Sequence, residues 1–575
     1  VWDYALDLKN FHEQSHNRPI VPILVATEAI DATSEFKPFD DKVFYPILTN
    51  REQLSSTIAE ALLFCDTDSS EGDALWAISR YSPTPTIIEA ASALYNNHSV
   101  EDISRTDASA ENLTTTCGFI SSVIERAKRE HFKAICFVTG VPGAGKTLVG
   151  LNIATQQFEK DDVAVYLSGN FPLVQVLTEA LARDKKRRMV EKGEKIAIGT
   201  ARSEVKAFIQ MIHHYRDTCL EGTKVVDGRI VADEAYYLNP KNLKKSFVPV
   251  DHVAIFDEAQ RAWTKDALAN FMNRKKGYPN FPYSEPEYLI SCLDRHDDWA
   301  VVVCLVGGGQ EINTGEAGIS EWIESLNREY KDWHVFISDR LHDAEYAAGR
   351  SLELLSEHEH VEFEPSLHLA VSMRSFRAEN LAKFVHKLLD RDVEGAREAY
   401  LTLDKYPIVL TRSLEKAKRW LKEHARGTER YGMIVSSQAE RLKPLAIDVR
   451  FKPDVVHWFL DDATDVRSSF YLEDVATEFD VQGLELDWSC VVWDGDFRYT
   501  PSGWSHHSFC GDKWQNINKP ERKAFQKNAY RVLLTRARQG MVLVVPEGNP
   551  EDPTRSSAYY DSTYEYLKEI GIIVI

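Results

Sequence analysis

The sequence predicts an α/β protein built on parallel sheets and divided into several domains. Apolar, strand-like runs at 133–138 and 252–256 each end in residues typical of a phosphate site, and the first run passes into a segment of helical period. The chain is 575 residues long, which is more than one ordinary core holds, so two to four domains are expected.

The first of these runs enters a glycine-rich turn, "GVPGAGKT", from Gly140 to Thr147. Glycines let successive backbone N–H groups point at phosphate oxygens, and the following helix directs its positive end at the same anion. In this pattern Lys146 binds the β- and γ-phosphates, and the Thr147 hydroxyl holds Mg²⁺. A plain surface turn is the alternative, but the flanking strand and helix patterns favour nucleotide binding. The predicted cofactor-binding residues of the turn are Gly140, Gly143, Ala144, Gly145, Lys146 and Thr147.

Two carboxylates, Asp257 and Glu258, follow the second run. Asp257 is predicted to hold Mg²⁺, and Glu258 is predicted to polarise the attacking water. An Asp-Glu pair after a strand is often only the start of a capped helix, and the phosphate loop upstream is what favours catalysis. Gln260 completes a D-E-x-Q pattern, which is typical of helicase-type ATPases.

An ordered set of motifs resembles those of superfamily 1 helicases, and most closely those of the bacterial helicase-like family that is similar to the C-terminal part of Schlafen proteins. The resemblance covers 112–574. The matching stretches are "AVYLSGNFPLV" (motif Ia, 164–174), "VVVCLVGGGQEIN" (motif III, 301–313), "LAVSMRSFRAENLAKFV" (motif IV), "ATEFDVQGLELDWSCVVWDG" (motif V) and "NAYRVLLTRARQGMVLVVP" (motif VI).

The resemblance implies two RecA-like domains, at 111–360 and 361–575, with an insertion near 178–250. It implies ATP as the nucleotide, and it implies that motif Ia contacts the nucleic-acid backbone. It makes Gln310 a sensor of the γ-phosphate, and it makes Arg374 and Arg536 cations that face the nucleotide from the second domain. It also includes Gln482, Gly483 and Glu485, the Q-G-L-E core of motif V, in the site.

Cations that arrive only when two domains close can stabilise the charge that develops on the γ-phosphate. Hydrolysis would then be tied to opening and closing of the cleft. The alternative for Arg374 and Arg536, taken singly, is a surface salt bridge.

Two departures from the family pattern weaken the prediction of ordinary stepping along a single strand. Motif III often carries an aromatic residue that stacks on a base, a contact worth about 1–3 kcal/mol per base. This sequence has no aromatic residue between the motif III glycines and Trp322. No clear adenine-reading glutamine precedes Gly140 either, so ATP rests on the resemblance alone.

Residues 1–80 resemble the later part of a PD-(D/E)xK nuclease. Residues 81–110 are predicted to form a linker that contains prolines and runs into a helix. The first 27 residues are predicted to form strand, loop and strand. Asp7 and Lys9 end the first strand as an acid-x-Lys pair, in which carboxylates hold Mg²⁺ and the lysine orients water. The partner acid is expected upstream of Val1, with Asp3 a poorer candidate. Solvated charges on an ordinary strand are the alternative.

A net charge of −20 opposes nucleic-acid binding, because phosphate affinity comes from Lys and Arg. Local basic tracts at 183–188, 241–245 and 273–276 are the candidate contacts, with solvated charged faces as the alternative. The eight cysteines include no C-x-x-C pair, and the sequence has no signal peptide and no run of about 18 apolar residues. These features predict a cytoplasmic protein without membrane association.

The sequence thus predicts a nucleic-acid-dependent ATPase that acts as a helicase or translocase, with DNA favoured over RNA and neither excluded. The resemblance also suits bacterial antiphage defence with a coupled N-terminal nuclease. One alternative is an ATP-driven conformational switch that controls a protein partner without unwinding. Another is a nuclease effector in which the motor only licenses cutting. A protein partner or a homo-oligomer is left open.

Overall fold

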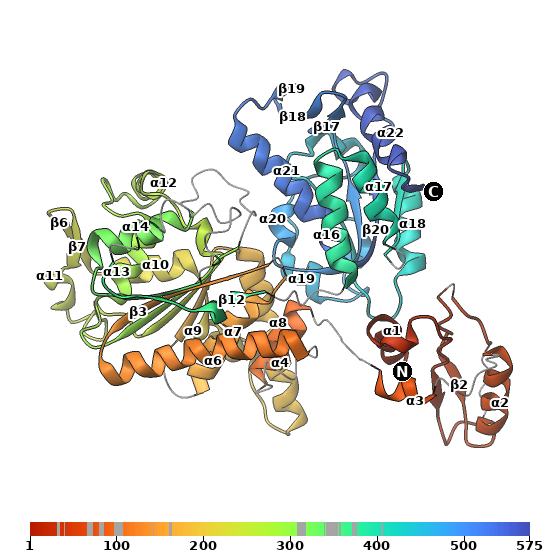
Figure 1. Ribbon diagram of the computed structural model, residues 1–575, viewed down its shortest axis with the longest axis horizontal. Helices are drawn as coiled ribbons and strands as arrows, with labels where there is room; N and C mark the ends of the chain where they lie inside the picture. Colours follow the sequence, from red (N-terminus) through yellow and green to blue (C-terminus); the bar gives the residue numbers. More distant parts are fainter. Residues whose placement is uncertain are drawn as a thin grey trace.

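The computed structural model has three parts: a small N-terminal segment and two larger α/β domains (Figure 1). It describes the chain except at 31–34, 40, 66–72, 80–85, 97–106, 142, 160–163, 308–317, 339, 341–352, 354, 356–357, 371–375 and 404–405. The predicted α/β class with parallel sheets is confirmed, since every strand pair within the two main sheets is parallel.

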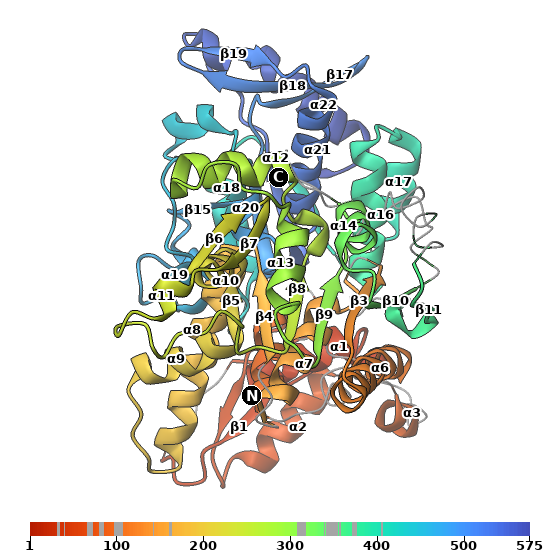
Figure 2. The same cartoon turned by 90° about the vertical axis from the view of Figure 1, so that its left-hand side faces the viewer.

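The sheet of the first domain has the order β11-β10-β3-β9-β8-β4-β5, and a short strand, β12, pairs with the end of β3 (Figure 2). Its strands are β3 (Lys133–Gly140), β4 (Ala164–Ser168), β5 (Ile209–Met211), β8 (Val253–Asp257), β9 (Ala300–Leu305), β10 (His334–Ile337), β11 (Val361–Phe363) and β12 (His368–Leu369). The central strands are buried on both faces, which explains why they read as continuous apolar runs.

Helices cover both faces of this sheet. On one face Ala134, Cys136 and Val138 of β3 join a core with α6 (Asp107–Glu130), α7 (Lys146–Glu159) and α8 (Phe171–Glu191). On the other face Ile135 and Phe137 join a core with α13 (Glu285–Leu293) and α14 (Ser320–Glu329). The alternation follows from the two-residue period of a strand.

The chain between α8 and β8 folds into several further elements. These are α9 (Ile198–Phe208), β5, α10 (Ile212–Leu220), the antiparallel hairpin of β6 (Thr223–Val226) and β7 (Arg229–Ala232), and α11 (Glu234–Tyr237). Strand β5 extends the main sheet next to β4, whereas the hairpin lies outside it.

The sheet of the second domain has the order β15-β14-β16-β20-β13-β21. Its strands are β13 (Ile408–Thr411), β14 (Tyr431–Val435), β15 (Val475–Thr477), β16 (Leu486–Val492), β20 (Ala537–Val544) and β21 (Ile573–Val574). The helices of this domain are α16 (Phe376–Leu389), α17 (Val393–Leu401), α18 (Leu414–His424), α19 (Val455–Leu460), α20 (Glu478–Val481), α21 (Pro520–Leu534) and α22 (Asp561–Glu569). A small antiparallel sheet of β17 (Phe497–Thr500), β18 (Gly503–Cys510) and β19 (Lys513–Asn516) follows β16.

The N-terminal segment corrects one expectation. Residues predicted to form the first strand are a helix, α1 (Trp2–Phe11), because the buried positions Ala5, Leu6 and Lys9 follow helical rather than alternating spacing. The expected second strand is present as β1 (Ile23–Val25), which pairs in parallel with β2 (Ile47–Thr49). Helices α2 (Leu54–Phe64) and α3 (Asp73–Ile78) complete the segment.

One ion pair joins this segment to the second domain. The Arg426 guanidinium donates two hydrogen bonds to the carboxylate of Asp41, at 3.0 and 2.7 Å, and lies 5.0 Å from the ring centroid of Phe39. The side chain of Arg426 is only 10% exposed, so the pair is shielded from water. The Thr428 backbone N–H also donates to Asp3, at 3.3 Å.

A buried polar cluster fixes α21 against the carboxyl end of β16. The carboxylate of Asp496 accepts hydrogen bonds from Tyr530 at 2.6 Å, from Ser436 at 2.7 Å and from the Gln526 amide at 3.1 Å. Burial and the nearby carboxyl of Asp494 raise the pKa of Asp496 to about 7. The side chains of Tyr530 and Gln526 are thereby held in place on α21.

Replacement of Asp496 by Asn tests this cluster through the pH dependence of stability. The folded state holds the proton up to about pH 7, whereas the unfolded chain releases it near pH 4. The stabilising contribution of this carboxyl is therefore complete below pH 4 and is lost as the pH rises to 7. We expect the melting temperature of the wild type, relative to Asp496→Asn, to fall across this window and then to level off. A difference that is constant from pH 4.5 to 8 would contradict the assignment.

Candidate nucleotide site at the facing edges of the two sheets

The phosphate loop lies between the carboxyl end of β3 and the first residue of α7. Gly143 and Gly145 have φ angles of 78° and 87°, a left-handed conformation that favours glycine. A Cβ at Gly140 would lie 2.7 Å from the Cβ of Leu369, so the pairing of β12 also requires glycine there. The Lys146 ammonium donates to the carbonyl of Gly140 at 2.8 Å and is thus held over the loop.

Asp257 faces this loop from the end of β8. The Thr147 hydroxyl donates to Asp257 Oδ1 at 3.3 Å, and the Ser168 hydroxyl donates to Oδ2 at 3.4 Å. Burial, and then the charge of Glu258, raise the pKa of Asp257 to about 6. A hydroxyl and a carboxylate are oxygen ligands of the type that Mg²⁺ prefers. A divalent cation would relieve the cost of burying this negative charge, so the residues fit the ion.

Glu258 has a left-handed backbone conformation, with φ 52° and ψ 47°, which is uncommon for a residue other than glycine. Such strain persists only where the surroundings impose it. The Gln260 amide donates to the Glu258 carboxylate, and its oxygen accepts from the Gly307 backbone N–H at 2.9 Å. A Cβ at Gly307 would lie 2.9 Å from both side chains, so this glycine of motif III packs directly on Glu258 and Gln260. Gln260 thereby orients Glu258.

Motif V of the second domain contacts this edge of the first domain through Gln482. Its backbone carbonyl accepts a hydrogen bond from the Asn170 amide in motif Ia at 2.6 Å, and its side-chain oxygen accepts from Arg261 at 2.9 Å. Gly483 has a φ of 77°, and a Cβ there would lie 3.2 Å from the Asn170 amide nitrogen. Motifs Ia and V are therefore in direct contact.

Motif VI lies beside motif V at the amino ends of β16 and β20. The Leu486 N–H donates to the carbonyl of Arg536 at 3.1 Å, and Leu486 pairs with Ala537 in the sheet. The Arg536 side chain is buried, and its Nε donates to the carbonyl of Val532 at 3.1 Å. The amino edge of the second sheet thus faces the carboxyl edge of the first (Figure 1).

Arg538, which the sequence reasoning did not single out, links all three parts of the chain. Burial alone would lower the pKa of Arg538, but the carboxylates of Asp487, Glu485 and Glu89 outweigh it and raise the pKa. Glu89 belongs to α4 (Ile87–Tyr95), which packs on α7 and α8 of the first domain. The same Glu89, together with burial, raises the pKa of Asp7 on α1. Only the tertiary fold brings these charges together.

The remaining predicted site residues belong neither to the phosphate loop nor to motif V. Gln310 and Arg374 lie outside the described residues. Asp7 lies on a helix near Arg538 rather than at the end of a strand, and the buried Lys9 ammonium donates to the carbonyl of Arg18 at 2.9 Å. The strand context expected of the acid-x-Lys pair is therefore wrong.

Carboxylates neutralise most of the predicted basic tract at 183–188 and one cation in each of the tracts at 241–245 and 273–276. The ion pairs in or from these tracts are Arg183 with Glu179 and Asp461, Lys185 with Glu204, Arg187 and Arg188 with Asp184, Lys245 with Glu221, and Lys276 with Asp217. The tract at 183–188 therefore contributes mainly to packing between helices and between domains.

The chain was compared with curated proteins and with solved structures. No curated protein matches the sequence. Chains of solved structures that match include a DUF1998 helicase, MrfA, bound to DNA and AMPPNP, with 11% identity and a TM-score of 0.28. That match covers 86% of this chain and 55% of the helicase, so the present chain spans about half of its length.

The chain also matches a family model, and its helices were compared with membrane-spanning ones. None of the helices in the described part of the chain combines the length and the apolar character that a membrane crossing requires. The family model described as "Schlafen group 3, DNA/RNA helicase domain" matches residues 133–547, which include every motif of the site. The chain belongs to this helicase-domain family.

Proposed function

We propose that the chain is a nucleic-acid-dependent ATPase of the superfamily 1 type, which acts as a helicase or translocase on DNA in preference to RNA. The observation that carries the proposal is the pair of hydrogen bonds to Gln482 from Asn170 and Arg261. Asn170 belongs to motif Ia, and Arg261 follows the D-E-x-Q motif, so the two bonds connect both motifs of the first domain to the second domain. A change at the nucleotide can then be transmitted to both domains.

The residues of the site have complementary roles in this proposal. The N–H groups of the phosphate loop and Lys146 bind the phosphates, and Thr147 and Asp257 hold Mg²⁺. Bound there, the ion supplies charge neutralisation at the phosphate oxygens. Glu258, oriented by Gln260, polarises the attacking water.

The cations come from the second domain. Arg536 lies at the amino edge of the second sheet, so it reaches the γ-phosphate only as the two edges approach each other. Arg374 and Gln310 have the same proposed roles as in related helicases, namely a second arginine from that domain and a γ-phosphate sensor. Gly483 and Glu485 shape the loop that carries Gln482, since Glu485 pairs electrostatically with Arg538.

The Lys146→Ala variant tests the hydrolytic site. We expect at least a hundredfold lower turnover with the fold retained, because Lys146 contacts loop carbonyls rather than the core. Phosphate release is measured alone and with single-stranded DNA, duplex DNA and RNA, with the exposed Lys331→Ala as the matched control. Turnover of Lys146→Ala equal to that of Lys331→Ala would remove the site assignment.

The Gln482→Ala variant tests coupling between the domains. We expect stimulation by the preferred polymer to drop about tenfold, because the hydrogen bond that the Arg261 guanidinium donates to the Gln482 side chain disappears. A hydrogen bond to a charged group is worth about 1.5–3 kcal/mol, and the bond from Asn170 to the Gln482 backbone carbonyl remains. The exposed Gln515→Ala serves as control. Unchanged stimulation in Gln482→Ala would show that the contact between Arg261 and the Gln482 side chain transmits nothing.

A second candidate function is an ATP-driven switch that controls a protein partner. The acidic net charge and the paired basic tracts favour it. ATP hydrolysis that is indifferent to every polymer would support the switch and would contradict the motor.

We propose separately that residues 1–80 form a nuclease-like unit. Residues 81–110 would join it to the motor domains at 111–360 and 361–575. Coupling of cutting to the motor in the cytoplasm would suit antiphage defence. We expect Mg²⁺-dependent strand cleavage that is lost in Lys9→Ala, measured on labelled DNA and RNA. Equal cleavage by Lys9→Ala and the wild type would exclude Lys9 from the chemistry. The test is needed because Lys9 lies on a helix and not at the end of a strand, as the nuclease pattern expects.

A further inference from the structure

A cavity of about 200 Å³ opens at the carboxyl edge of the second sheet. Its lining comes from three elements: Ser437 and Gln438 after β14, Glu478 and Phe479 after β15, and Arg522 and Phe525 of α21. In open α/β sheets, ligands bind outside the carboxyl ends of the strands. The cavity is smaller than the roughly 300–1,000 Å³ of ordinary small-molecule sites, so it has room for one flat ring system.

The floor of the cavity is rigid. The buried Glu478 carboxylate accepts hydrogen bonds from the N–H and the hydroxyl of Ser437, at 2.8 and 2.6 Å. Gln526, one residue from Phe525, is held by Asp496. The two aromatic residues of the cavity therefore stand on elements that are fixed by buried polar contacts.

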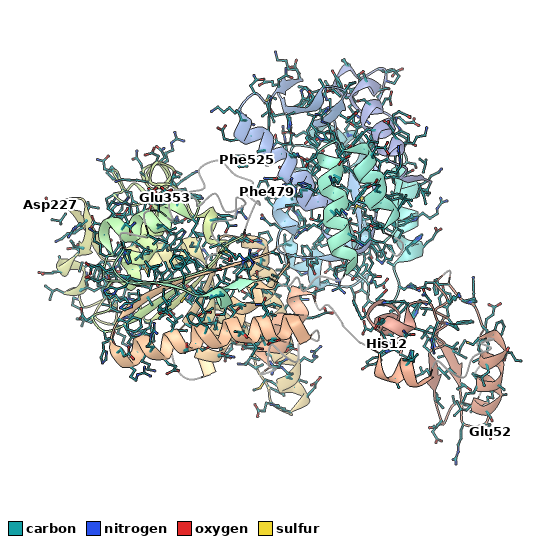
Figure 3. All side chains as sticks on the ribbon, in the orientation of Figure 1. His12, Glu52, Asp227, Glu353, Phe479 and Phe525 are labelled. Carbon is teal, nitrogen blue, oxygen red and sulfur yellow. The ribbon has the colours of Figure 1, made fainter. Side chains whose placement is uncertain are left out.

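Phe479 and Phe525 lie on the side of the second domain that is nearest the first domain (Figure 3). Phe479 is 38% exposed and Phe525 is half-buried. Many aromatic side chains among the described residues pack in pairs, such as Trp493 with Phe497 and Tyr499 with Tyr566. Neither Phe479 nor Phe525 is paired with another ring among the residues that the structure describes. Because both rings line the same cavity, they offer flat apolar faces to a ligand there.

The adjoining surface has a net positive charge, because three cations stand beside a single carboxylate, Glu521, in this stretch. Lys519, Arg522 and Lys523, at the start of α21, are all exposed. None of the three has a carboxylate partner among the residues that the structure describes, in contrast to the paired tract at 183–188. In a chain with a net charge of −20, three such cations beside two aromatic rings suit a ligand that is both flat and anionic.

We infer that this cavity receives an unstacked base of a single-stranded nucleic acid, with Phe479 and Phe525 stacking on the base and Lys519, Arg522 and Lys523 binding the flanking phosphates. The inference rests on the proposed function and deepens it. It also supplies the stacking residue that motif III lacks. Trp322, the nearest aromatic residue after motif III in the sequence, is fully buried and donates its indole N–H to the carbonyl of Ala259 at 2.9 Å.

The test measures binding of the full chain to fluorescein-labelled 20-mers of dT, of U and of an abasic backbone, by fluorescence anisotropy. Variants are the double replacements Phe479→Ala with Phe525→Ala, Phe479→Leu with Phe525→Leu, and Phe479→Tyr with Phe525→Tyr. The exposed Phe363→Ala, on the edge strand β11, is the matched control. Melting temperatures confirm that each variant folds.

We expect the Ala and Leu pairs to bind the base-bearing strands at least tenfold more weakly, because stacking on an aromatic ring contributes about 1–3 kcal/mol per base. The Tyr pair retains binding, and affinity for the abasic strand is the same in all variants. The slope of affinity against salt is unchanged by the Phe replacements. It becomes shallower when Lys519, Arg522 and Lys523 are replaced by Ala. Preference for dT or U distinguishes DNA from RNA as the source of the base.

Four outcomes would overturn the inference. Ala variants that bind base-bearing strands as Phe363→Ala does would remove the cavity from nucleic-acid binding and leave the proposed function intact. Leu variants that bind as well as the wild type would show that an apolar contact suffices and that stacking is not needed. An equal loss of affinity for the abasic strand would show that the rings do not contact bases. A wild-type chain that binds no strand would refute the inference and the proposed function together.

Discussion

The bridge at Gln482 is the contact on which the arrangement of the two sheets depends. It links the backbone of motif V to the side chain of Asn170, which also caps α8 by accepting from the Leu173 N–H at 3.3 Å. Because Asn170 follows β4 by two residues, the bridge couples the second domain to the edge of the sheet that carries Asp257. The left-handed Gly483 leaves room for the Asn170 side chain, because a Cβ there would lie 3.2 Å from the Asn170 amide nitrogen.

A second set of contacts extends the same linkage to the N-terminus. Arg538 follows Arg536 by two residues and interacts with carboxylates from β16, from α4 on the first domain and from the motif V loop. Asp7 of α1 lies near the same charges, and Arg426 fixes Asp41 to the second domain. The N-terminal segment is therefore linked to the second domain both by the Arg426–Asp41 ion pair and by the charges around Arg538.

The sequence predicted what is local and missed what is tertiary. The phosphate loop was predictable because Gly143 and Gly145 need left-handed backbone within a few residues of a strand and a helix. Helix α1 was misread because a short stretch with Trp2, Tyr4 and Leu6 alternates like a strand, while its burial follows helical spacing. Arg183 pairs with Glu179 four residues before it on the same helix, but its second partner, Asp461, lies in the other domain, and no local pattern shows that contact. Gln482 was predicted as part of a motif, but its two partners come from distant segments.

The acidic net charge ceases to oppose nucleic-acid binding once the charges are placed in space. Interactions between exposed charges are largely screened beyond about 8–10 Å at physiological salt. A phosphate therefore interacts with the local set of cations, and in the tract at 183–188 four of the five cations are paired with carboxylates. The free cations at the start of α21 are few, so counterion release alone would give weak binding with a shallow dependence on salt. Aromatic stacking adds affinity that does not depend on charge. An acidic chain can thus hold a strand by its bases, while its remaining surface repels the backbone of other nucleic acids.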